Sequence, residues 1–203
     1  MYRVYWIHHT CVCFILPVQE KRSEIMEIIF WILGVILLII IGIVLYIILR
    51  NKKILKRKND ILQLFSNACK EKGIEEYKLE YVKKSTHDFY FETDKHIYYI
   101  KVIYNLSNQE ICINNAIKWQ LRRLNDHNET FSFVEGVEPL MRLDLTNTEK
   151  KEHKLFIIYP DITALLKVIN ECEMVFVYPD TDVYGARVIS YDKLVEDTSI
   201  LEI

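Results

Sequence analysis

One apolar segment constrains this chain more than any other feature. Residues 28–49, IIFWILGVILLIIIGIVLYIIL, form a run of 22 residues without a charged side chain. At about 1.5 Å of helical rise per residue, such a run extends roughly 33 Å, which is enough to cross a hydrocarbon core of about 30 Å. We therefore expect a transmembrane helix over residues 26–50.

Two other interpretations of the apolar segment fit less well. A helix that is apolar on every side also occurs in the core of a large soluble protein, but about 150 residues are too few to enclose one. A cleaved signal peptide has an apolar region of about 7–15 residues that ends in small residues. Here the run is longer and is followed by RNKK. Trp31 and Tyr46 lie toward its two ends, where amphipathic rings favour the headgroup boundary.

Six basic residues, here called the basic cluster, follow the apolar run: Arg50, Lys52, Lys53, Lys56, Arg57 and Lys58. Few basic residues precede the run, and acidic residues partly offset them. The positive-inside rule therefore predicts a single-pass protein of the cell membrane with its C-terminal domain in the cytoplasm. The same cluster also suits contact with anionic lipid headgroups, at about 1 kcal/mol per residue.

The pattern divides the chain into four parts. We expect a disordered N-terminal tail over 1–25, the transmembrane helix over 26–50, a basic juxtamembrane segment over 51–59 and a cytosolic α/β domain over 60–203. Met26 directly precedes the apolar run, so translation from Met1 and translation from Met26 both fit. The tail contains HHTCVC at 8–13, but its spacing is not typical of a zinc site, and we expect no metal there. Cys69, Cys112 and Cys172 are expected to be buried, reduced thiols.

The cytosolic part alternates helix and strand patterns. An amphipathic helix is predicted over 60–73, with Asp60 as its N-cap and Gly73 as its stop. Alternating aromatic residues predict three strands, near 77–81, 89–92 and 96–104, which form an antiparallel meander. A short strand is predicted at 110–113, and weak helical spacing occurs at 116–124.

The last third predicts a strand at 154–160, a helix at 161–173 and a strand at 174–179. A right-handed crossover of this kind makes the two strands parallel. A short helix capped by Ser190 follows. The expected fold class is α/β. More specifically, we expect an α+β arrangement with one mixed sheet, in which some strands are antiparallel and others parallel.

Element order and the stretch HDFYFETDKHIYYIKV at 87–102 resemble the restriction-endonuclease-like fold, the PD-(D/E)XK superfamily, over roughly 60–180. The resemblance implies an Asp at the second strand and an acid and a Lys two residues apart on the third, with two carboxylates holding Mg²⁺. Asp88 matches the first acid and Lys101 matches the Lys. Tyr99 stands where the second acid belongs, so Glu92 and Asp94 are the candidate replacements, although Asp94 falls in the turn between the strands.

Three functions follow from these patterns. The first is a binding or scaffolding domain with a catalytically inactive nuclease-like fold and no cofactor. Its partner is expected to be another protein, because the formal net charge of -2 becomes about -8 without the basic cluster, which disfavours nucleic acid. The second is a membrane-tethered nuclease that uses Mg²⁺ with Asp88, Glu92 and Lys101. The third is a sensor of anionic lipid surfaces. Glycine-rich phosphate loops and nucleophile elbows are absent from the sequence.

Overall fold

The computed structural model describes residues 18–82, 86–104, 109–123, 132–147, 149–170 and 173–203, with side chains from Met26 onward. The chain divides into two compact units, Met1–Ile54 and Leu55–Ile203. Of the expected N-terminal tail, residues 1–17 lie outside the described part, and with them HHTCVC. Residues 18–25 are helical.

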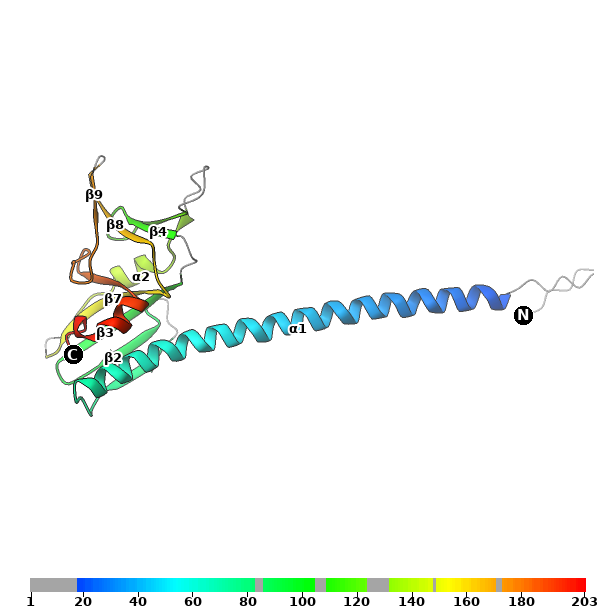
Figure 1. Ribbon diagram of the computed structural model, residues 1–203, viewed down its shortest axis with the longest axis horizontal. Coiled ribbons are helices and arrows are strands. Elements are labelled where there is room, and N and C mark those ends of the chain that lie inside the picture. The colour runs from blue at the N-terminus through cyan, green and yellow to red at the C-terminus, as the bar shows by residue number, and fades with distance from the viewer. Residues whose placement is uncertain (1–17, 83–85, 105–108, 124–131, 148, 171–172) are drawn as a thin grey trace, which may run out of the picture. The chain divides into compact units, whose positions relative to one another are not determined.

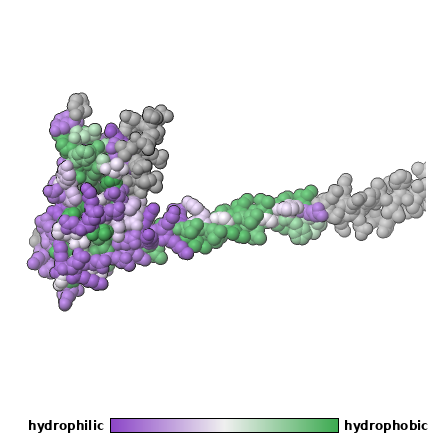
Figure 2. All heavy atoms as spheres, viewed as in Figure 1, coloured by the Kyte–Doolittle hydropathy of each residue, from purple (hydrophilic) through white to green (hydrophobic). Residues whose placement is uncertain are grey.

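The first helix, α1 (Val18–Glu71), contains the apolar run. By length and composition, its part from Met26 onward is long and apolar enough to cross a membrane, with a mean hydropathy of 3.4 in an 18-residue window of which 0% is buried. Hydrophobic residues make up most of the visible surface of the apolar run (Figure 2). The chain therefore has one candidate membrane helix among its described residues.

The helix predicted at 60–73 is not separate, because α1 continues through it. The intervening RNKKILKRKN contains no Gly or Pro and is rich in good helix formers, so nothing in it ends the helix. Asp60 consequently lies inside α1 and is not an N-cap; it accepts a 2.5 Å hydrogen bond from the hydroxyl of Tyr159. The stop is confirmed, since α1 ends at Glu71 and Gly73 has a φ of +68°.

Sheet A contains the predicted meander (Figure 1). Its strands are β1 (Lys78–Tyr81), β2 (Phe89–Glu92), β3 (His96–Tyr104), β7 (Lys151–Tyr159) and β10 (Ala186–Ser190), and they lie in that order across the sheet. Strand β1 pairs antiparallel with β2, and β2 pairs antiparallel with β3, which confirms the meander. Strand β7 is parallel to both β3 and β10.

Sheet B lies in the order β6 (Ser132–Phe133), β5 (Trp119–Arg123), β4 (Gln109–Ile113), β8 (Ala164–Asn170) and β9 (Glu173–Phe176). The short strand expected at 110–113 is confirmed as β4. The helical spacing at 116–124 was misleading, because β5 occupies that segment and pairs with β4 and β6. The molecule is thus a mixed α/β structure with two mixed sheets, and the short helix α2 (Val137–Met141) lies between them (Figure 1).

The helix predicted at 161–173 is wrong, and so is the strand-helix-strand unit built on it. Residues Ala164–Asn170 form β8, which pairs parallel with β4 and antiparallel with β9. The apolar residues of this segment fit helical and strand periods equally well, and pairing on both sides decides in favour of the strand. Consequently β7 and β9 belong to different sheets.

Each face of sheet A borders a hydrophobic core. On one face pack the C-terminal turns of α1, with Phe65 against Phe91 at 5.0 Å between ring centroids, and the helix α3 (Tyr191–Glu196) through Leu194. On the other face, sheet B and α2 enclose Trp119 and Phe156. Ser190 caps α3 as expected, and the 3-10 helix η1 (Thr198–Ile200) follows it. Cys69 and Cys112 are buried free thiols, whereas Cys172 lies outside the described residues.

Candidate functional site

A set of polar side chains covers part of sheet A on the face toward sheet B. Residues in register on neighbouring strands point to the same side of a sheet. Tyr90, Tyr99 and Lys154 form one such row, and Glu92, Ile97 and Glu152 form the next. Together with Asp88 and Lys101, which contact each other, the polar members make up what we call the polar face.

Asp88 and Lys101, the two residues that match the nuclease-like pattern, lie together on this face. Lys101 Nζ is 3.1 Å from Asp88 Oδ1, and the backbone N–H of Val102 donates to Asp88 Oδ2 at 3.0 Å. The two side chains are only 16% and 19% exposed. The stem of Lys101 passes so close to Gly136 that a Cβ there would lie 2.5 Å from Lys101 Cε. Both carboxylate oxygens of Asp88 thus accept a hydrogen bond from the protein, one from Lys101 and the other from the Val102 N–H.

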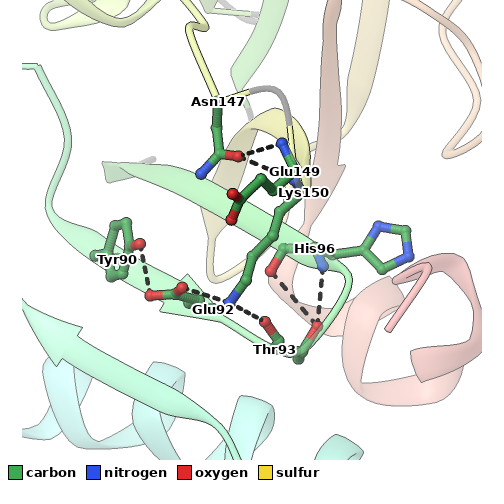
Figure 3. A network of polar contacts seen from close by, with 7 residues as sticks. All are labelled: Tyr90, Glu92, Thr93, His96, Asn147, Glu149 and Lys150. Carbon is green, nitrogen blue, oxygen red and sulfur yellow. Dashed lines mark hydrogen bonds and ion pairs between the residues drawn. The ribbon is translucent and has the colours of Figure 1, made fainter.

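Glu92 does not join Asp88. The two residues are four apart along one extended segment, which separates their Cα atoms by roughly 13 Å. Glu92 instead accepts from Lys150 Nζ at 2.6 Å and from the Tyr90 hydroxyl at 2.7 Å (Figure 3). These hydrogen bonds, the one from Lys150 first, lower the pKa of Glu92. The structure thus brings together Asp88 and Lys101 but leaves Glu92 in a different cluster.

Lys150 is aimed at Glu92 by a local turn. The side-chain oxygen of Asn147 accepts from the backbone N–H groups of Glu149 and Lys150 at 2.8 and 2.9 Å (Figure 3). This Asx-type turn fixes the backbone just before β7. Lys150 Nζ then also reaches the carbonyl oxygen of Thr93, at 2.8 Å. The loop before β7 is therefore tied to the β2–β3 turn.

Glu152 is a member of the polar face that the sequence did not indicate. Its Oε1 accepts from the Tyr99 hydroxyl at 2.7 Å, and its Oε2 accepts from the backbone N–H of Asn147 at 2.7 Å. Burial first, and then the hydrogen bond and charge of Glu152, raise the pKa of Tyr99 to about 12. Burial likewise raises the pKa of Tyr90, and its hydrogen bond to Glu92 adds to the effect. The alternation in KEHKLFIIY predicts the face of Glu152 but not the strand beside it.

The polar face is a self-paired network and not an assembled Mg²⁺ site. Each oxygen of Asp88, Glu92 and Glu152 accepts a hydrogen bond from a protein donor. Lys154 is likewise engaged, because its Nζ donates to the carbonyl oxygen of Met141 at 2.7 Å and burial lowers its pKa. A magnesium ion would have to displace several of these donors to gain two carboxylates. The geometry suits holding the described residues 136–147, 149 and 150 against sheet A.

The basic cluster separates into two groups. Arg50, Lys52, Lys53 and Lys56 are exposed. In contrast, the Arg57 guanidinium lies 4.6 Å from the ring centroid of Tyr104, and Lys58 Nζ lies 4.2 Å from that of Tyr81. The last two cations therefore contact aromatic rings of sheet A as cation–π pairs.

The hairpin of β8 and β9 carries exposed apolar side chains, which we call the apolar hairpin. Its members are Ile169, Met174, Val175, Phe176 and the nearby Tyr178, with exposures of 38% to 61%. Strand β9 lies at the margin of sheet B and pairs, among the described residues, with β8 alone (Figure 1). The sequence did not predict this hairpin, because residues 161–173 were expected to form a helix.

Comparison with protein families, with curated proteins and with solved structures found no match to this chain.

Proposed function

We propose that this protein is a single-pass membrane protein whose C-terminal α/β domain faces the cytoplasm and binds another protein. The apolar part of α1 supports the anchor, and the basic residues that follow it support the orientation. The main support for a protein-binding function is the exposure of the apolar side chains on the apolar hairpin. Contiguous exposed apolar side chains on an otherwise folded domain are typical of interaction sites.

The edge of β9 suits a partner that adds a strand to sheet B. All residues of β9 are exposed, and the strand offers a free backbone edge within the described structure. A partner strand would gain main-chain hydrogen bonds from that edge and apolar contacts from Met174 and Phe176. The charges near the hairpin favour a protein over a lipid surface, because Glu173, Asp180 and Asp182 are exposed and acidic.

The order of sheet A supports a degenerate restriction-endonuclease-like domain. The last turns of α1 precede the β1–β2–β3 meander, and the next strand of the sheet, β7, is parallel to β3. The region between β3 and β7 departs from the family order, because it contains three strands of sheet B and the five-residue α2. We propose that the fold lost catalysis, since Asp88 is held by Lys101 and by the Val102 N–H.

Site-specific photocrosslinking in the cells that express the protein tests the binding function. A photoreactive phenylalanine replaces Phe176 in one variant and Val195, which is exposed on α3, in the matched control. We expect one adduct of defined mass from position 176 that is absent from position 195. Adding Ile169→Asp and Met174→Asp should abolish the adduct. Adducts that form equally at both positions, or at neither, would contradict the proposal.

A further inference from the structure

Three potential metal ligands from distant parts of the chain meet near the N-terminal ends of β3 and β7, two neighbouring strands inside sheet A. His96 begins β3, His153 lies in β7 and Glu202 follows η1. His96 Nδ1 and His153 Nε2 are 2.9 Å apart, and one ligand atom from each of the three residues lies within 4.8 Å of the others. The cluster is separate from the polar face, because the imidazole of His96 points away from the Tyr90–Glu92 network (Figure 3).

The spacing is close to that of a tetrahedral site. Zinc bonds to imidazole nitrogen at about 2.0–2.1 Å, so neighbouring ligand atoms lie roughly 3.3 Å apart. The two histidine nitrogens need to separate by only a few tenths of an ångström to admit an ion. Glu202 needs a larger movement, and its side chain is 39% exposed and so has room to make it.

The neighbours hold the cluster in shape. The ring of Tyr98 stacks on His153 with centroids 4.4 Å apart and an interplanar angle of 11°, which fixes the imidazole orientation. Burial lowers the pKa of His153 and so favours the neutral imidazole. The neutral form is the one that binds a metal ion. Glu202 accepts from Lys151 Nζ at 2.8 Å through Oε2 and from Arg187 through Oε1. A metal ion would therefore displace one of these donors or share its oxygen, while the other donor would remain as an outer partner of the carboxylate.

We propose that His96, His153 and Glu202 bind one divalent transition-metal ion of the zinc type. Imidazole and carboxylate ligands suit Zn²⁺, and three protein ligands leave a fourth position for water. The bound ion would fasten the C-terminal segment to β3 and β7. The positive charges of Lys151 and Arg187 oppose a cation, so the affinity is modest.

Metal binding is measured on the untagged full-length chain in detergent. Cys11→Ser and Cys13→Ser, together with His8→Gln and His9→Gln, form the background, so that HHTCVC does not contribute. After treatment with EDTA, the protein is equilibrated with Zn²⁺ and bound metal is counted by mass spectrometry. We expect one equivalent in the parent and an affinity at least tenfold lower in His96→Gln and in Glu202→Gln. Glu173→Gln, an exposed carboxylate on β9, is the matched control and should bind as the parent does.

Two further measurements separate this site from adventitious binding. Lys151→Met should strengthen Zn²⁺ binding severalfold, because it removes a positive charge beside Glu202 without removing a ligand. Cobalt(II) should give the intense visible absorption of a tetrahedral complex in the parent and lose it in His153→Gln, with circular dichroism confirming that the variant is folded. A parent that binds no equivalent, or histidine variants that bind as well as the parent, would overturn the proposal.

Discussion

The hydroxyl of Tyr99 donates a 2.7 Å hydrogen bond to Oε1 of Glu152 and so joins β3 to β7. Tyr99 stands two residues before Lys101, where the nuclease-like pattern has its second acid. A carboxylate is therefore present beside this position, but it comes from the neighbouring strand and is engaged by a neutral phenol. The same contact makes the stability of the domain depend on pH in alkaline solution.

Replacement of Tyr99 by Phe should destabilise the domain by about 1.5–3 kcal/mol near neutral pH, because it removes one hydrogen bond to a charged acceptor. The folded state raises the pKa of Tyr99 to about 12 from a model-peptide value of about 10. The unfolded chain therefore loses this proton first as pH rises. The contribution of Tyr99 is complete below about pH 10 and declines between about pH 10 and pH 12.

Urea unfolding of the parent and of Tyr99→Phe at several alkaline pH values measures this effect. The difference in unfolding free energy should shrink as pH rises above about 10. Tyr178→Phe is the matched control, because it removes a hydroxyl from an exposed side chain outside the polar face. A difference that stays constant up to about pH 11 would show that the phenol of Tyr99 is not held in its neutral form.

The contact between Asp88 and Lys101 predicts a measurable coupling energy. Both side chains are mostly buried, and in such pairs the removal of one partner leaves the other charge poorly compensated. A double-mutant cycle with Asp88→Asn and Lys101→Met should give a coupling of about 1–2 kcal/mol. The exposed pair Lys78–Glu80 offers a comparison, where the coupling should be below about 0.5 kcal/mol. Equal coupling energies for the two pairs would contradict this account.

Local alternation predicted the β1–β2–β3 meander, because Phe89 and Phe91 mark one face of a strand without reference to the rest of the chain. The segment from Ala164 to Asn170 was misassigned, because its strand character depends on β4 and β9, which are distant in sequence. The pairing of Asp88 with Lys101 was within reach of sequence reasoning. The roles of Glu152 and Lys150 were not, because they depend on the register of β7 against β3 and on the turn at Asn147.

The network on the polar face predicts that the protein does not cleave nucleic acid. The full-length chain in detergent, supplied with Mg²⁺ or Mn²⁺, should leave single-stranded and double-stranded DNA and RNA intact. Asp88→Asn should not change this result, since the Asp88 carboxylate is occupied by Lys101 and by the Val102 N–H. Metal-dependent cleavage that Asp88→Asn abolishes, and that the exposed substitution Asp180→Asn does not, would establish the nuclease alternative.

The division of the basic cluster predicts that its members act on different properties. Arg57→Met should lower the unfolding free energy of the domain by about 0.5–1 kcal/mol, because the Arg57 guanidinium lies over the Tyr104 ring. Replacing Arg50, Lys52 and Lys53 by Gln should leave that stability unchanged, since these side chains are exposed. Membrane orientation should instead change in the Gln variant and stay the same in Arg57→Met. Under the positive-inside rule, the basic residues directly after the apolar run decide the orientation.

A reporter fused to the C-terminus measures this orientation in cells. The parent and Arg57→Met should both place the reporter in the cytoplasm, whereas the Gln variant should place part of it outside. Liposomes containing anionic lipid provide a separate test, since a lipid sensor would lose binding in the Gln variant in proportion to the charges removed. If the Gln variant keeps both its orientation and its lipid binding, then neither property depends on Arg50, Lys52 and Lys53. Lys56, Arg57, Lys58 or the apolar run itself would then have to determine how the chain lies in the membrane.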